Sequence, residues 1–268
     1  MDELNPLLAV GDARKKLSFF IEMTHAWGMK TVMDFIPWLA PEAIDSSNYT
    51  WTWWKEVNEN KAIAERWNEE FRGLTDPDKD KKIQELLEKN DAYCAISIIE
   101  NGAERVVLVK RLYYGRNADQ VELNPEHPGV QRYYLNSLKR LIDMGIDEVR
   151  VDLPHLLFRN SLPLKEQPWY KIISEAKKYA KDEYGRDIIF NMETYEVDEN
   201  LFGLSLDQQN MISTGADRVY SRVLFEIMFG IARGERPVTD LYSAVKHMQG
   251  ISDADVAKLL IFLSNFDR

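Results

Sequence analysis

The sequence lacks the features that mark several large classes of protein. Its 268 residues include a single cysteine, Cys94, so no disulfide can form within the chain, and a reducing, cytoplasmic location is expected. No apolar run is long enough to cross a membrane. The first residues have neither a basic start nor the apolar core of a signal peptide. These absences indicate a soluble globular protein.

The charge balance and the missing motifs exclude further functions. The chain carries 34 basic and 44 acidic residues, a net charge of -10, which argues against a nucleic-acid or anionic-membrane partner. A Gly-rich phosphate loop, a His-Glu-x-x-His sequence, paired metal-binding cysteines and a Gly-x-Ser-x-Gly elbow are all absent from the sequence. We therefore expect no cofactor and no metal, and we expect the mid-helix His25 to be a structural histidine.

The stretch 145–155 organises the rest of the chain. Gly145 ends a helical run, and an apolar strand follows that carries Arg150 and finishes at Asp152. These two residues are two apart, so on a strand they point to the same face. An arginine beside an aspartate favours the ionised carboxylate that a nucleophile needs. An ordinary ion pair at a strand end is the alternative interpretation.

Helices and strands alternate on both sides of a long excursion, which predicts an α/β fold with a parallel sheet. Helices are expected over 12–27, 133–142, 165–184, 222–233 and 253–260, and strands over 30–36, 146–152, 187–193, 217–221 and 261–267. Residues 40–125 interrupt the alternation with two helix-like runs, at 59–72 and 78–90, and a strand at 105–112. We therefore divide the chain into a barrel part at 1–39, an inserted subdomain at 40–125 and a second barrel part at 126–268.

Acidic residues stand at or near the ends of four predicted strands: Asp34, Asp152, Glu193 and Asp267. The carboxyl ends of parallel strands meet at one mouth of a barrel. A pair of carboxylates flanking one bond is what glycoside cleavage requires. Each acid taken alone is better explained as a capping or turn residue, and Glu196 competes with Glu193 for the role of the acid.

Tryptophans gather in the inserted subdomain just after the first predicted strand, at Trp51, Trp53 and Trp54. Flat indole faces suit the stacking of sugar rings. A small satellite core under a long loop explains them equally well.

These residues resemble, in order and spacing, the four motifs of the α-amylase superfamily, glycoside hydrolase family 13. The matching segments are Thr24–Lys30 with Met33–Pro37, Val149–Asp152, Ile188–Glu193 and Asn265–Asp267, and 119–125 resembles the phrase that follows the family's inserted domain. The resemblance implies a (β/α)8 TIM-type barrel with an inserted subdomain after the third barrel strand. It also implies an enzyme that acts on α-glucan or maltooligosaccharide substrates.

The resemblance also implies a role for each site residue. Asp152 corresponds to the nucleophile, Glu193 to the acid/base and Asp267 to the third catalytic acid. Arg150 corresponds to the partner of the nucleophile, and Asp34 to a substrate-binding residue. His155, Trp53 and Trp54 are further candidate substrate-binding residues, and calcium, which is common in the family, is not supported by any ligand set that we can place.

Two departures from the family pattern narrow the expectation. Trp38-Leu39 replaces the Asn-His of the first motif, and Phe266 replaces the histidine of the fourth. His155 stands three residues after Asp152, as in the maltosyltransferase-like members, and Trp51–Lys55 is similar to their aromatic stretch. The sequence therefore favours that branch, with a non-catalytic carbohydrate-binding or scaffold relative as the alternative.

The predicted barrel is incomplete in this chain, because only five barrel strands are found where eight are needed. The family's first two strands would precede residue 1, and its eighth would follow Arg268. We therefore expect either a partner or missing chain segments to complete the barrel.

Overall fold

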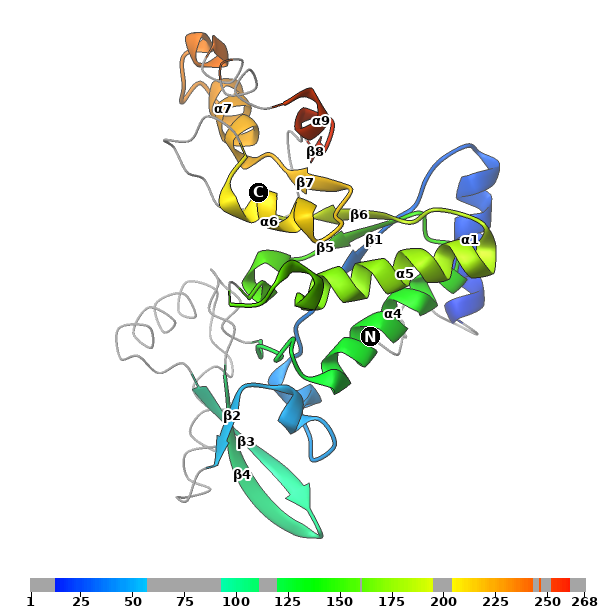
Figure 1. Cartoon of the computed structure of the whole chain (residues 1–268), viewed down its shortest axis with the longest axis vertical. Coiled ribbons are helices and arrows are strands. Elements are labelled where there is room, and N and C mark those ends of the chain that lie inside the picture. The colour runs from blue at the N-terminus through cyan, green and yellow to red at the C-terminus, as the bar shows by residue number, and fades with distance from the viewer. Residues whose placement is uncertain are drawn as a thin grey trace. The chain divides into compact units, whose positions relative to one another are not determined.

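The structure, a computed structural model, describes residues 13–56, 93–110, 120–159, 161–194, 204–242, 246 and 252–260. The chain divides into two compact units (Figure 1). The first comprises Met1–Ile36 and Gln131–Arg268, and the second comprises Pro37–Val130. Each unit is considered by itself below.

The first unit contains a sheet of five parallel strands, as the sequence predicts. The strands lie in the order β1 (Val32–Phe35), β5 (Glu148–Val151), β6 (Ile189–Met192), β7 (Arg218–Tyr220) and β8 (Leu259–Leu260). All four pairings are parallel, and Asp34 is opposite Arg150, which is opposite Asn191 on the next strand. Within this sheet the strands lie side by side in their order along the chain. Because they are parallel, each connection between them is a crossover. The predicted α/β class is confirmed.

One helix, α1 (Ala13–Ala26), precedes the first strand, and helices fill most of the connections between the strands. The described helices of these connections are α4 (Pro128–Asp143), α5 (Pro168–Tyr184), α6 (Leu206–Ser213), α7 (Arg222–Ala232) and α9 (Asp253–Val256). Short 3-10 turns occur at η2 (Pro41–Ala43), η3 (Tyr49–Trp51), η4 (Pro154–Leu157), η5 (Leu164–Glu166) and η6 (Val238–Asp240). Among these helices, none has both the length and the apolarity needed to span a bilayer.

The predicted helix over 253–260 is wrong in its second half. The helix ends at Val256, and Leu259 and Leu260 form strand β8 instead. Leu259 pairs with Val219 and Leu260 with Tyr220. Backbone pairing with β7 therefore overrides the helical spacing of the apolar residues.

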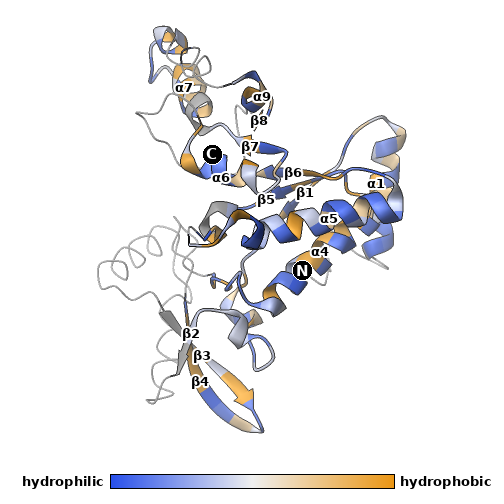
Figure 2. Cartoon of the chain, in the orientation of Figure 1, coloured by the Kyte–Doolittle hydropathy of each residue, from blue (hydrophilic) through white to orange (hydrophobic). Residues whose placement is uncertain are grey.

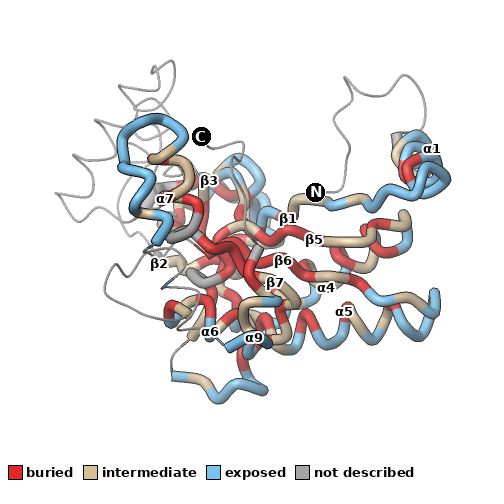
Figure 3. Tube along the Cα trace, turned by 90° about the horizontal axis from the view of Figure 1, so that it is seen from above, coloured by how far each residue is buried: buried red, intermediate tan, exposed pale blue. Residues whose placement is uncertain are grey.

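Three buried aromatic side chains join the sheet to two helices. The ring of Phe35 on β1 meets Tyr134 of α4 at 5.7 Å and Trp169 of α5 at 6.4 Å, both edge to face, and Tyr134 and Trp169 stack at 5.8 Å. Figure 3 shows the buried residues concentrated along β5, β6 and β7. Since successive side chains on a strand alternate, the residues next to Phe35 point to the other face of the sheet.

The second unit holds a small antiparallel sheet in the order β2 (Trp54–Glu56), β4 (Ala103–Lys110) and β3 (Tyr93–Glu100). Asn101 and Gly102, both with positive φ, make the tight turn between β3 and β4. Figure 2 shows apolar and polar residues next to one another along this hairpin. Apolar residues of the hairpin belong to a buried hydrophobic core within the second unit. The prediction placed a strand at 105–112 and missed β3; the predicted runs at 59–72 and 78–90 lie outside the described residues.

Candidate active site

The face of the sheet opposite the aromatic core is lined by polar side chains. On β5 the apolar Val149 and Val151 are fully buried, and the residues between and beyond them alternate to the other face. The same alternation along β1, β6 and β7 adds further polar residues to it. The side chains on this face are Asp34, Glu148, Arg150, Asp152, Asn191, Glu193, Arg218 and Tyr220.

Arg150 connects three carboxylates at the C-terminal end of the strands. Its Nη1 donates to Asp34 Oδ1 at 2.8 Å and Oδ2 at 3.0 Å, and to Asp152 Oδ1 at 2.9 Å. Its Nη2 forms an ion pair with Glu193 Oε1. One guanidinium thus holds acids from β1 and from the ends of β5 and β6, as the strand-end pattern predicts.

The surroundings of Arg150 keep it charged. Burial acts to lower the pKa of this guanidinium, but the hydrogen bond to Asp34 and the charges of Glu193 and Asp34 outweigh burial and raise the pKa above its usual range. Its side chain is only 7% exposed, so water screens these attractions little. Arg150 is therefore a permanent positive charge facing the acids.

The two acids that follow β5 and β6 are fixed by the backbone. The amide of Asp152 donates to Phe35 O at 3.0 Å, and the amide of Glu193 donates to Val151 O at 3.1 Å. Glu193, which is 1% exposed, also accepts a hydrogen bond of 3.2 Å from the amide of Leu153 at Oε2. These hydrogen bonds extend the strand pairing to Asp152 and Glu193 themselves. The two carboxylates therefore project from rigid strand ends rather than from loops.

Leu153 has an unusual backbone conformation. Its φ of 41° lies in the left-handed region, which a bulky side chain adopts at a cost of about 1–3 kcal/mol. The turn it makes directs its amide to Glu193 and sends the chain into η4. A strained residue immediately after Asp152 is typical of a functional site.

A second group of polar residues on the same face of the sheet was not predicted. Glu148 Oε2 accepts hydrogen bonds of 2.9 Å from Asn191 Nδ2 and from Arg218 Nη1, which ties together β5, β6 and β7. Each member precedes Arg150, Glu193 or Tyr220 by two positions along the chain. This spacing of two residues was the signal in the sequence for the second polar group. It becomes informative only once the register of the strands is known.

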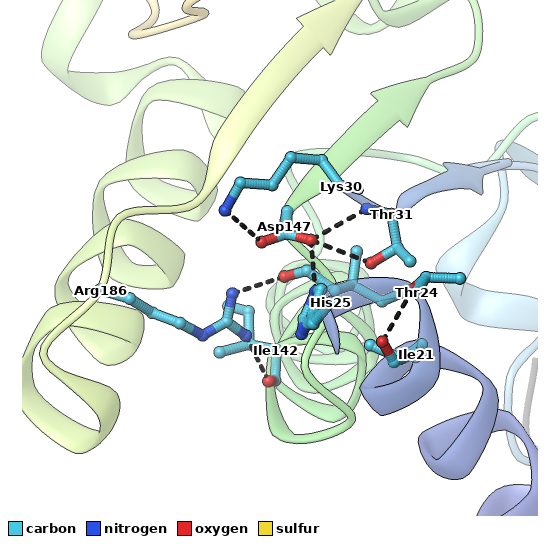
Figure 4. Close-up of polar contacts among 9 residues, drawn as sticks. Ile21, Thr24, His25, Lys30, Thr31, Ile142, Asp147 and Arg186 are labelled. Carbon is cyan, nitrogen blue, oxygen red and sulfur yellow. Dashed lines mark hydrogen bonds and ion pairs between the residues drawn. The ribbon is translucent and has the colours of Figure 1, made fainter. Parts of the chain in front are cut away.

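The opposite end of β5 carries a separate ionic cluster around Asp147 (Figure 4). Asp147 accepts hydrogen bonds from His25 Nε2 at 2.7 Å, Lys30 Nζ at 3.0 Å and the amide and hydroxyl of Thr31 at 2.9 and 3.1 Å. Burial acts to raise the pKa of Asp147, but these bonds prevail and lower it to about 2. His25 is thus a structural histidine, as expected, and this end of the strand serves stability.

The remaining predicted site residues are placed only in part. Asp267 and Glu196 lie outside the described residues, and His155 belongs to η4 with its side chain outside them. In the second unit, the half-buried Trp54 packs edge to face on Tyr49 at 5.0 Å.

Trp54 therefore has a structural role in the second unit. Trp54 packs against the core of the second unit, and the Arg105 guanidinium lies 5.8 Å from its ring. Trp53 is half-buried too. Among the described residues, no group of three or more His, Cys, Asp and Glu side chains is arranged to hold a metal ion.

A parallel sheet whose strand ends carry a carboxylate cluster defines an α/β protein with a candidate active site. No protein-family model matches the sequence, and no curated protein matches it. The fold is nevertheless shared with solved enzymes of the α-amylase family, so the predicted resemblance is confirmed for the fold.

Three of these structures illustrate the match. The α-amylase from H. orenii aligns with a TM-score of 0.57 at 15% identity, covering 95% of this chain and 46% of its own. The debranching enzyme from Nostoc punctiforme gives 0.56 at 13%, covering 94% and 46%. The maltogenic amylase from S. marinus gives 0.53 at 15%, covering 95% and 33%. The chain thus spans less than half the length of each.

Proposed function

We propose that this chain carries the catalytic face of an α-glucan-active retaining glycoside hydrolase or transglycosylase. Its substrates would be α-1,4-linked glucose oligomers or polymers. The observation that carries the proposal is the single guanidinium of Arg150 shared by Asp34, Asp152 and Glu193. Cleavage of a glycosidic bond needs two carboxyl groups held at a fixed separation on a rigid support, and the ends of β5 and β6 supply such a pair.

Each carboxylate has a distinct part in the proposed reaction. Asp152 attacks the anomeric carbon and forms the glycosyl-enzyme, while Glu193 protonates the leaving oxygen and then activates the incoming water or sugar. A retaining pair stands roughly 5–5.5 Å apart. Contact of both side chains with the same guanidinium supports such a spacing.

Other residues complete the proposed substrate site. Asp34, which shares Nη1 of Arg150 with Asp152, would bind sugar hydroxyls, as would His155. Asp267 would be the third acid, and Trp53 and Trp54 would stack on sugar rings. The absence of both family imidazoles supports the maltosyltransferase-like branch.

The fold proposed for this function is a (β/α)8 barrel that is incomplete in this chain, with an inserted subdomain after its third strand. The division of the chain at Pro37 and Val130 supports the insertion. Val32 on β1 is 55% exposed and Trp27 after α1 is 71% exposed, which supports a partner or further chain segments packing there. A cytoplasmic location fits the single cysteine.

The test is to incubate the full chain with maltooligosaccharides of one length and to resolve the products over time. Hydrolysis yields only shorter oligomers, whereas transfer yields shorter and longer ones together, and the two ladders separate the activities. Trp54→Ala and Asp152→Asn serve as comparisons for binding and for chemistry. Saturable binding of the oligomer without any product would overturn the proposal and leave the non-catalytic carbohydrate-binding relative in its place.

A further inference from the structure

Tyr220 lies beside Arg150 on the polar face of the sheet. It is the last residue of β7, two positions after Arg218, and it is 8% exposed. The guanidinium carbon of Arg150 lies 5.9 Å from the centroid of its ring. A cation at this distance from an aromatic ring is attracted by the ring's quadrupole, and the attraction strengthens when both groups are shielded from water.

Tyr220 is held in place from two neighbouring elements. Its carbonyl oxygen accepts hydrogen bonds from Thr194 Oγ1 at 3.1 Å and from Gln208 Nε2 at 2.8 Å. Gln208 is fixed in turn by a capping box with Ser205 at the start of α6. Thr194 directly follows Glu193, so the strand end that carries the acid also anchors the tyrosine.

We propose that Tyr220 is a positioning residue that keeps the Arg150 guanidinium oriented between Asp152 and Glu193. The planar guanidinium of an arginine binds two carboxylates together only when the orientation of its plane is fixed. The ring of Tyr220 lies next to the Arg150 guanidinium on the side of β7. Burial raises the pKa of Tyr220, so the side chain stays neutral and adds no charge to the cluster. The inference rests on the proposed glycosidase function.

The proposal assigns the positioning of Arg150 to the ring of Tyr220, while the Tyr220 hydroxyl also forms a hydrogen bond with Arg150. Tyr220→Leu removes the ring, and we expect it to lower kcat on an activated maltosyl substrate about 10- to 100-fold with KM changed by less than about threefold, because misplacement by about 1 Å costs this much. Tyr220→Phe restores the ring and should return kcat to within about threefold of wild type. Tyr179→Phe is the matched control, since its hydroxyl bonds to Asp143 between two helices and not to the cluster.

A second variant keeps the test decisive if Tyr220→Leu fails to fold. Thr194→Val is nearly isosteric and removes one of the two hydrogen bonds to the Tyr220 carbonyl. We expect a fall in kcat of about three- to tenfold, with thermal unfolding monitored alongside. A folded Tyr220→Leu variant with the wild-type kcat overturns this inference. If that variant does not fold, a wild-type kcat in Thr194→Val overturns it instead. In either case the proposed function stands as long as turnover still depends on Asp152. A wild-type protein without turnover overturns the proposed function and this inference with it.

Discussion

Replacing Arg150 by methionine tests whether the carboxylate cluster depends on one guanidinium. Methionine keeps most of the side-chain length and removes the hydrogen bonds to Asp34 and Asp152 and the ion pair to Glu193. The acids then face one another without a counter-charge. Because Glu193 is 1% exposed, water cannot replace the lost partner.

The expected loss of stability follows from the burial of each acid. Removing one partner of a buried ion pair costs about 3–5 kcal/mol, because the other charge is left uncompensated. Asp34 contributes little to this cost, since its side chain is 35% exposed and its pairing is screened by water. For a chain of this size the loss corresponds to a fall in Tm of roughly 6–20 °C.

Thermal or urea unfolding followed by tryptophan fluorescence measures the effect. Combining Arg150→Met with Glu193→Gln removes the orphaned charge, so the double variant should recover about 1 kcal/mol or more relative to the sum of the two single changes. Arg218→Met is the control on the same face: its side chain is 39% exposed, and its loss should cost about 1 kcal/mol or less. Additive single changes, or an Arg150→Met variant no less stable than Arg218→Met, would refute the argument.

Two further predictions concern other parts of the chain. The pKa of Asp147 is lowered from 3.8 to about 2, so its bonds contribute about 2 kcal/mol that is fully present above pH 4 and lost as the pH falls toward 2. Asp147→Asn should lose this contribution at pH 7 and show a flatter decline of stability in acid titration; an unchanged decline would contradict this. Trp54→Ala should lower the stability of the second unit by about 2 kcal/mol, because Trp54 packs on Tyr49. Calorimetric titration of this variant with maltooligosaccharide then tests whether Trp54 contacts the sugar. An affinity equal to that of the wild type would remove Trp54 from the substrate site.

The strand-end acids were predictable because their signal is local. Gly145, with φ of 97°, ends the run after α4, and the alternation of apolar and polar residues after it sets both the strand and the face of Arg150. Asp152 and Glu193 stand directly after strands of four residues. The sequence alone therefore indicates which acids share the mouth of the sheet.

The features that escaped prediction depend on contacts between distant segments. Tyr220 reads as an ordinary strand residue until the pairing of β6 with β7 brings it beside Arg150. Leu259 has helical spacing in the sequence and becomes a strand residue only by pairing with Val219. By contrast, β3 carries a local signal that was overlooked, in its alternation and the Asn101-Gly102 turn.

The central claim, that Asp152 is the nucleophile of a retaining pair, is tested most directly by the turnover of an activated maltosyl substrate. Asp152→Asn preserves the shape of the side chain and removes its charge, so we expect turnover to fall by about 10⁴-fold or more while the protein stays folded. The double variant with Arg150→Met should be scarcely worse than Asp152→Asn alone, because the two residues act as one unit. Turnover by Asp152→Asn at near the wild-type rate would contradict the claim.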